Sequence, residues 1–288
     1  MRAAVARHHG RTGLWIEATE GFVELSQSAN PESGLAGIRD VGDLLAASDQ
    51  AMHDAMAIVS STKGVTLESL ELLPPVMNPR AFVCVGRNYL EHIKEEGKAP
   101  IPPYPYLFSK FSNALNGHRQ PVRHHLTESL DYEGELAVVI GKAASRVSAD
   151  EAMDYVGGYT ILNDVSGRDL QNQDQQWIRG KSLDTWAPLG PVFVSADEIP
   201  DPYSLRIETR VNGELRQEAP VSDMIFKIPE LIAFITQGIT LQPGDLIATG
   251  TPSGVGLGFD PPKWLQVGDQ IDITIEPIGT LSNAVAAQ

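Results

Sequence analysis

Short apolar segments that stop at a glycine dominate this 288-residue chain. Residues 81–85 form one such segment before Gly86, and residues 136–140 form another before Gly141. Their length and their content of β-branched residues are typical of buried strands. Helical patterns do not alternate regularly with these segments, as a doubly wound parallel sheet requires. The sequence therefore predicts a β-rich α+β fold with short helices.

Four local signals make this expectation more specific. Residues 40–58 have apolar positions near the helical period, and residues 228–236 form a second helical pattern. Ser148 and Glu151 fit a capping box, which predicts that a helix begins there. The pair 212–213 is Asn-Gly, which predicts a hairpin turn because both turn positions require positive φ.

The first third of the chain has a pattern of its own. Short strand-like pieces come first, the helical pattern follows, and prolines interrupt the chain between residues 74 and 79. This change predicts a boundary near residue 78. We expect a small N-terminal α/β domain over 1–78 and a larger catalytic domain over 79–288.

Charge and composition exclude several kinds of partner. The chain has 37 acidic and 22 basic residues, a formal charge of −15, which disfavours nucleic acid and anionic membrane surfaces. A single cysteine, Cys84, allows neither an intramolecular disulfide nor a thiolate zinc site. Residues 1–20 lack the apolar core of a signal peptide, and no apolar run approaches the roughly 20 residues of a membrane span. We expect a cytoplasmic protein.

Three acidic residues are candidate metal ligands. Glu133 and Glu135 are two apart before an apolar run, so a strand would place them on one face with Cα atoms roughly 6.6 Å apart. Asp164 follows another strand-like segment that starts at Tyr159. Carboxylates without cysteine favour Mg²⁺, Mn²⁺ or Ca²⁺ over zinc. The alternatives are two glutamates facing water at a sheet edge and an aspartate that caps a helix or turn.

A histidine and a glutamate form a candidate acid–base pair. His92 and Glu95 are three residues apart, so one helical turn would bring their side chains together. A carboxylate orients an imidazole and raises its basicity, although an exposed chance pair is the alternative. The proline-rich residues 97–106 form either a mobile lid or a surface loop. Lys181 either stabilises an enolate or is a solvated lysine.

The order of several motifs resembles the fumarylacetoacetate hydrolase family, in the branch of acylpyruvate hydrolases and 2-hydroxyhepta-2,4-diene-1,7-dioate isomerases. The resemblance covers roughly residues 80–283 and is weaker before residue 78. It rests on Val85-Gly-Arg-Asn-Tyr-x-x-His-x-x-Glu95, Asp131-Tyr-Glu-x-Glu-Leu-Ala-Val-Val-Ile-Gly141, Gly158-Tyr-Thr-x-x-Asn-Asp-Val-Ser-x-Arg-Asp-Leu-Gln171, Gly180-Lys-Ser-x-Asp184 and Pro243-Gly-Asp-x-Ile-x-Thr-Gly-Thr-Pro-x-Gly254.

This resemblance implies a partly rolled mixed β-sheet domain that commonly forms homodimers. It implies a small anionic 2-oxo acid as substrate, with Mg²⁺ or Mn²⁺ as the cofactor. The implied site residues are the metal ligands Glu133, Glu135 and Asp164, the catalytic residues His92, Glu95 and Lys181, and the substrate contacts Arg87, Tyr89, Gln171 and Thr251. Arg168 also matches, either near the substrate or in a structural ion pair.

The implied chemistry is formation of a metal-stabilised enolate. Hydrolysis of a carbon–carbon bond in an acylpyruvate-like substrate is the first expectation, with His92 and Glu95 activating water. Decarboxylation of oxaloacetate and isomerisation of unsaturated 2-hydroxy diacids are alternatives on the same site. A more remote alternative is a non-catalytic protein in which the acidic cluster holds a structural Ca²⁺. That protein would have no use for a His–Glu pair.

Overall fold

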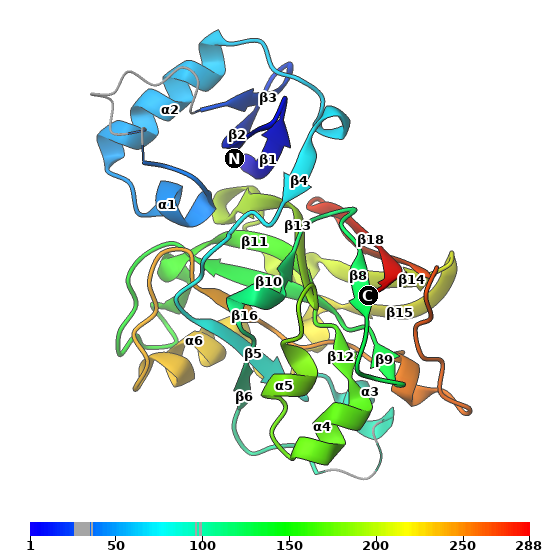
Figure 1. Ribbon diagram of the computed structural model, residues 1–288. Coiled ribbons are helices and arrows are strands. Elements are labelled where there is room, and N and C mark those ends of the chain that lie inside the picture. Colours follow the sequence, from blue (N-terminus) through cyan, green and yellow to red (C-terminus); the bar gives the residue numbers. More distant parts are fainter. Residues whose placement is uncertain (26–34, 36, 96, 98–99) are drawn as a thin grey trace.

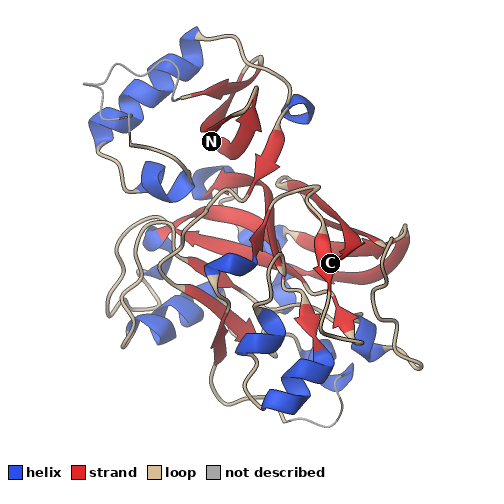
Figure 2. Cartoon of the chain, in the orientation of Figure 1, coloured by secondary structure: helices blue, strands red, loops and turns tan. Residues whose placement is uncertain are grey.

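The computed structural model describes residues 1–25, 35, 37–95, 97 and 100–288. Within these residues the protein is β-rich, with several sheets and few short helices (Figures 1 and 2). The predicted β-rich α+β class is therefore confirmed.

One 11-stranded sheet runs through the molecule. Its strand order is β3 (Gly21–Glu24), β2 (Arg11–Ala18), β1 (Arg2–His8), β13 (Ala187–Ser195), β11 (Val156–Asn163), β10 (Gly134–Ile140), β16 (Leu246–Ala248), β5 (Phe82–Gly86) and β6 (Tyr106–Ser109), with β4 (Glu71–Leu73) paired to β1 and β7 (Leu115–Asn116) paired to β13.

Two smaller sheets and the helices complete the fold. The five-stranded sheet has the order β15 (Glu214–Pro220), β14 (Arg206–Val211), β17 (Gln270–Ile275), β18 (Gly279–Ala287) and β8 (Val122–His124), and the two-stranded sheet pairs β12 (Ser166–Gly167) with β9 (Leu130–Asp131). The helices are α1 (Val41–Leu45), α2 (Asp49–Ser61), α3 (Leu90–Glu95), α4 (Arg168–Asp174), α5 (Ile178–Lys181) and α6 (Ile228–Thr236).

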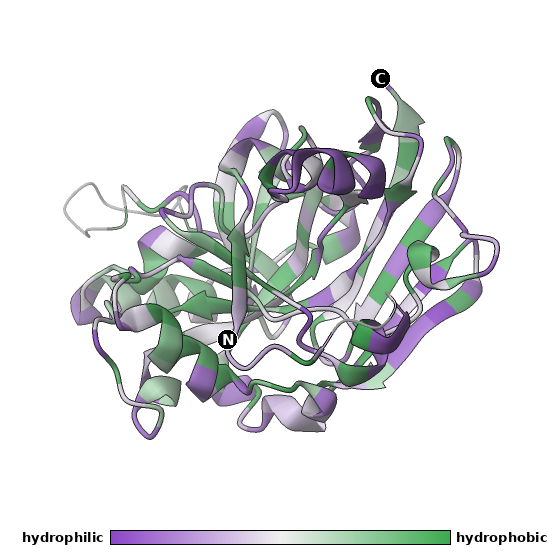
Figure 3. Ribbon diagram, turned by 90° about the horizontal axis from the view of Figure 1, so that it is seen from below, coloured by the Kyte–Doolittle hydropathy of each residue, from purple (hydrophilic) through white to green (hydrophobic). Residues whose placement is uncertain are grey.

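Strand β10 lies at the centre and is buried along its whole length. Leu136 and Val138 belong to the core shared with the five-stranded sheet. Ala137 and Val139 belong to the core that reaches α1 and α2. A strand covered on both faces reads as a continuous apolar run, which explains the sequence pattern here. The five-stranded sheet covers the core on one side only, so β14 alternates exposed and buried positions, visible as colour bands in Figure 3.

The N-terminal strands and helices form the upper lobe in Figure 1. Strand β1 pairs with β2, with β4 and with β13, so the lobe joins the main sheet through backbone hydrogen bonds. Helices α1 and α2 add Val41, Leu44, Ala51 and Ala55 to the core on this side. The domain boundary near residue 78 stays a prediction.

Two helix predictions need correction. Residues 40–58 form two helices because Ser48 caps the second, accepting the Ala51 N–H at 3.2 Å. The capping box was wrong: Glu151 accepts a hydrogen bond from the Ser148 hydroxyl at 2.6 Å, and only a short 3₁₀ turn follows. In a capping box each side chain binds a backbone N–H, whereas here the two side chains bind each other.

The other two local predictions are confirmed. Residues 228–236 form α6. Asn212 and Gly213 have φ of 51° and 80°, and they join β14 to β15 as a hairpin. In the part of the chain that the structure describes, no helix is long and apolar enough to cross a membrane.

Candidate active site

Three buried carboxylates meet where two central strands lie side by side. Glu133 precedes β10 and Glu135 is its second residue, while Asp164 directly follows β11. The strands are antiparallel with Gly134 opposite Asn163, so the start of one lies beside the end of the other. The three carboxylates offer oxygens that all lie within 4.8 Å of one another. The sheet register thus brings Asp164 to the two glutamates, which precede it by 31 and 29 positions in the sequence.

Buried cations surround these carboxylates. The Lys181 ammonium lies 2.7 Å from Glu133 Oε2 and 3.0 Å from Asp164 Oδ2. Lys110 lies 2.6 Å from the other oxygen, Asp164 Oδ1, and its side chain is fully buried. Arg168 Nη2 contacts Glu133 Oε1 at 2.7 Å. Sequence reasoning missed Lys110, whose only signal is that it directly follows a short apolar strand.

The surroundings shift the pKa values of Glu133 and Glu135 in opposite directions. Burial favours a protonated Glu133, but the charges of Lys181 and Arg168 outweigh burial and lower its pKa to about 2. Burial raises the pKa of Glu135 well above its ordinary value, and the charges of Asp164 and Glu133 raise it further. One carboxylate therefore stays ionised, while its neighbour retains a proton unless another cation arrives.

The donor set fits a divalent cation. Glu135 Oε2 accepts the Gly250 N–H at 2.9 Å, yet no cationic side chain among the described residues forms a salt bridge with it. A buried carboxylate held among other carboxylates is stabilised by a shared cation. Oxygen-only ligands suit Mg²⁺, Mn²⁺ or Ca²⁺. Glu133, Glu135 and Asp164 are therefore the residues that could hold such an ion.

The side chains of His92 and Glu95, predicted as an acid–base pair, are in contact in the structure. Both residues belong to α3, and His92 Nδ1 lies 2.7 Å from Glu95 Oε1. The second oxygen, Glu95 Oε2, accepts the Gly254 N–H at 2.7 Å. Gly254 has φ of +101°, and a Cβ there would meet the Arg216 carbonyl oxygen at 1.9 Å, so only glycine fits this close approach. Two contacts on one carboxylate therefore fix the orientation of the histidine.

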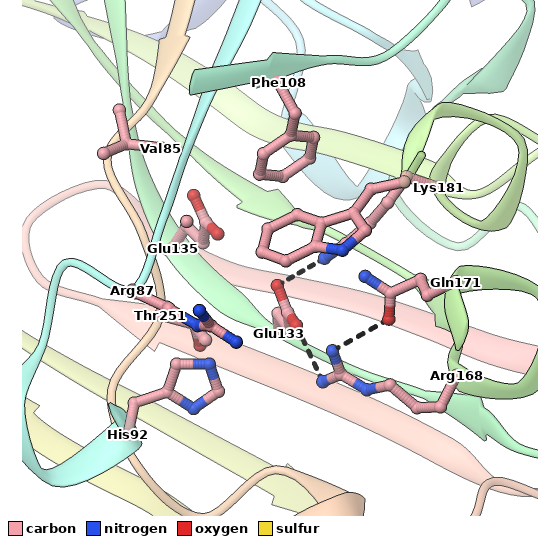
Figure 4. A pocket seen from close by; sticks show the side chains of 12 residues that line it. Val85, Arg87, His92, Phe108, Glu133, Glu135, Arg168, Gln171, Lys181 and Thr251 are labelled. Atoms are coloured by element: carbon pink, nitrogen blue, oxygen red, sulfur yellow. Dashed lines mark hydrogen bonds and ion pairs between the residues drawn. The ribbon is translucent and has the colours of Figure 1, made fainter. Parts of the chain in front are cut away.

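A cavity of about 280 Å³, which includes space open to solvent, is lined by His92 together with Glu133 and Glu135 (Figure 4). Figure 4 shows His92 on one side of Glu133 and Lys181 on the other, with Arg168 and Gln171 along one edge. Arg168 Nη1 donates to Gln171 Oε1 at 3.2 Å. The lining comprises Val85, Gly86, Arg87, His92, Phe108, Glu133, Glu135, Arg168, Gln171, Trp177, Lys181 and Thr251.

Two of the predicted substrate contacts are placed differently from the rest. Tyr89 is 2% exposed, belongs to the hydrophobic core and does not line the cavity, so this geometry gives no support to direct contact with substrate. Thr251 lines the cavity, but its hydroxyl donates to the Gly134 carbonyl and accepts from Gln217. The predicted lid over residues 97–106 includes residues 98 and 99, which lie outside the described residues.

The glycine-rich segment after β16 serves the protein's own carboxylates. Besides its contact with Glu95, the segment donates two N–H groups, from Gly256 at 2.6 Å and Leu257 at 3.1 Å, to the buried Asp131. Asp131 Oδ2 also lies 2.8 Å from Arg168 Nε. These N–H groups of residues 254, 256 and 257 thus have acceptors within the protein itself.

Comparison with known proteins gives this geometry a family. The model "Fumarylacetoacetate (FAA) hydrolase C-terminal" matches residues 81–286, about seven tenths of the chain. The chain belongs to the fumarylacetoacetate hydrolase family. The match includes the carboxylate triad, the His–Glu pair and the glycine-rich segment, and it begins just after the domain boundary expected near residue 78. The predicted family is therefore confirmed.

The relatives of this chain are named for different enzymatic activities. Oxaloacetate tautomerase YisK of Bacillus subtilis (strain 168) is 54% identical over 224 residues, 76% of this chain and 74% of that protein. Among solved structures, the fumarylacetoacetate hydrolase EaFAH from psychrophilic Exiguobacterium antarcticum has a TM-score of 0.82 and 36% identity, covering 100% of both chains. The 2-hydroxyhepta-2,4-diene-1,7-dioate isomerase from Mycobacterium marinum has a TM-score of 0.77 and 33% identity, and the match covers 100% of this chain and 99% of that chain.

The family supports an enzyme with an acidic metal site. Members of the fumarylacetoacetate hydrolase family are typically dependent on divalent metals, and this chain has the buried carboxylate triad that such an ion requires. The names of the relatives differ in reaction type, from hydrolase to tautomerase to isomerase. Family membership thus leaves the reaction to be argued from the site.

Proposed function

We propose that this protein catalyses keto–enol tautomerisation of a small 2-oxo diacid such as oxaloacetate, with Mg²⁺ or Mn²⁺ held by Glu133, Glu135 and Asp164. The observation that carries the proposal is that His92, held by Glu95 at 2.7 Å, lines the same cavity as two of these carboxylates. A proton acceptor thus lies beside a site for a carbonyl-polarising cation. Removal of a proton next to a carbonyl needs these two elements and no further nucleophile.

The metal would supply Lewis acidity, which lowers the free energy of an enolate formed from the 2-oxo acid. The other positive charges come from the chain itself. Lys181 and Arg168 lie within 2.7 Å of Glu133, so they add positive charge where the carboxylate and enolate oxygens of a substrate would bind. At the same edge of the cavity, Gln171 Oε1 accepts a hydrogen bond from Arg168 Nη1.

The histidine moves the proton. Because Nδ1 faces Glu95, Nε2 is the nitrogen through which His92 exchanges a proton with the substrate carbon. Glu95 stabilises the imidazolium that forms, and its bond to the Gly254 N–H keeps the carboxylate in place during the exchange. Return of the proton to the substrate carbon or oxygen completes the tautomerisation.

Carbon–carbon bond hydrolysis is the second candidate. The same His–Glu pair can take a proton from water, which would then attack a remote carbonyl of an acylpyruvate. The likeness to EaFAH, which spans both chains, favours this reaction. We rank it second because the tautomerase relative is 54% identical, against 36% for EaFAH. Decarboxylation of oxaloacetate and isomerisation of unsaturated 2-hydroxy diacids would use the same enolate.

We also propose, on the resemblance alone, that the protein is cytoplasmic and forms a homodimer.

A substrate panel separates these reactions. Enol absorbance of oxaloacetate is followed with and without Mn²⁺ or Mg²⁺, with the uncatalysed rate subtracted, while pyruvate release reports decarboxylation. Acetylpyruvate is assayed for loss of the 2,4-dioxo absorbance and for production of acetate and pyruvate. We expect metal-dependent acceleration of tautomerisation to exceed the other reactions. Acetate and pyruvate as the main products, without faster oxaloacetate tautomerisation, would replace the proposal with the hydrolase.

A further inference from the structure

Two aromatic side chains separate the catalytic cavity from a larger groove. Phe108 and Trp177 line the cavity of about 280 Å³, and both also line a neighbouring groove of about 1460 Å³ that is open to solvent. They are the two residues common to both linings. The two spaces therefore adjoin at these side chains.

The indole of Trp177 packs closely against neighbouring residues that hold it in place. Gly86 leaves room for it, because a Cβ at this position would lie 2.6 Å from the ring. The ring packs edge-on to Phe108 with centroids 5.2 Å apart and contacts Tyr106 at 4.9 Å. Gln175, in the left-handed region with φ of 59°, turns the chain between α4 and α5 just before the tryptophan.

The lining of the cavity divides into a charged side and an aromatic side. Glu133, Glu135 and Lys181 provide the charged side, where the carboxylate and keto group of a 2-oxo acid would bind. Trp177 and Phe108 adjoin this charged side, because the Lys181 Nζ lies 5.1 Å from the centroid of the Phe108 ring. The two aromatic side chains lie between the charged side and the open groove.

Arg87 places a positive charge beside the Trp177 indole. Its guanidinium carbon lies 5.9 Å from the centroid of the Trp177 ring, within the range of a cation–π contact. A short diacid would place its second carboxylate near this guanidinium. A longer apolar tail would have to displace the indole from its contact with this guanidinium.

We infer that Trp177 is a specificity-determining residue: its indole closes the aromatic end of the cavity, restricts the enzyme to short 2-oxo diacids and excludes longer 2,4-dioxo acids. This inference rests on the proposed function for the identity of the head group. Once the Trp177 side chain is removed, the open groove would provide room for a substrate tail beyond Phe108. Trp177 acts by shape, so its loss changes which substrate binds and leaves the proton-transfer residues in place.

The test compares Trp177→Ala and Trp177→Phe with wild type on oxaloacetate and on 2,4-dioxoheptanoate, which has a longer apolar tail. One methylene changes selectivity by about 10–200-fold in a closely fitting pocket. We therefore expect the kcat/KM ratio of long to short substrate to rise at least about tenfold in Trp177→Ala, mainly through a lower KM for the long substrate. Trp177→Phe should lie between, and Trp264→Ala, a half-buried tryptophan outside both linings, should leave the ratio unchanged.

A binding measurement keeps this inference separate from the proposed reaction. Oxamate and N-butyloxamate share an unreactive 2-oxo acid head, and calorimetry in Mn²⁺ measures the affinity of each. We expect wild type to bind oxamate more tightly and Trp177→Ala to reverse or remove that preference. Equal preferences in wild type and Trp177→Ala would overturn the inference, as would a wild type that binds both equally. Lack of tautomerase activity with reversed oxamate preference would contradict the proposed reaction only.

Discussion

Replacing Lys110 with methionine tests the charge balance around the carboxylates. Methionine fills a similar volume, so the main loss is the ammonium that lies 2.6 Å from Asp164 Oδ1. Both side chains are fully buried, which places the pair among those whose disruption costs about 3–5 kcal/mol. Asp164 keeps Lys181 at 3.0 Å, so we take the lower end, about 3 kcal/mol. For a chain of this size that corresponds to a fall in Tm of about 6–12 °C.

A matched substitution provides the control. Lys263 forms a 2.7 Å ion pair with Glu214, but both side chains are largely exposed. Such a pair contributes little, so Lys263→Met should shift Tm by no more than about 1 °C. Differential scanning calorimetry at pH 7, in chelator and again in saturating Mn²⁺, measures both variants. Because the loss of Lys110 leaves Asp164 undercompensated, Mn²⁺ should raise Tm more in Lys110→Met than in wild type. Equal Tm values for the two variants would refute the reasoning.

Three further predictions follow from the site. Glu135 has a raised pKa and must lose its proton to bind a cation, so Mn²⁺ affinity should increase as pH rises toward that pKa. Calorimetry in buffers of different ionisation enthalpy should detect the released proton, and an apparent binding enthalpy that does not depend on the buffer would contradict this. Glu133→Gln should weaken Mn²⁺ binding and activity together, and wild-type affinity would remove Glu133 from the ligands. Gly254→Ala should move the N–H away from Glu95 and lower kcat; an unchanged kcat would show that this contact does not orient the histidine.

Much of the site could be predicted because its signals are local. Glu133 and Glu135 are two residues apart at the start of a strand, and His92 and Glu95 are one helical turn apart, so short-range geometry brings each pair together. The β-rich class was also visible, because β10 is buried on both faces and therefore reads as an unbroken apolar run. Periodicity and spacing are sufficient for such features.

Features that depend on distant residues could not be predicted. Lys110 meets Asp164 across 54 positions, and no pattern around either residue indicates the pair. Trp177, at the start of α5, closes the cavity only because Gly86, at the end of β5, leaves room for its ring. The failed capping box at Ser148 has a similar lesson, since the motif was present but its serine bound the glutamate side chain instead of the backbone.

The central claim is that His92 transfers the proton while the carboxylates hold the metal. The most direct test measures oxaloacetate tautomerisation and Mn²⁺ affinity in His92→Ala. A positioned general base contributes about 10²–10⁴-fold, so kcat should fall by at least about a hundredfold. The Mn²⁺ dissociation constant should stay within about threefold of wild type, because His92 is not among the three carboxylate ligands. Unchanged turnover in a variant that still binds Mn²⁺ would contradict the account.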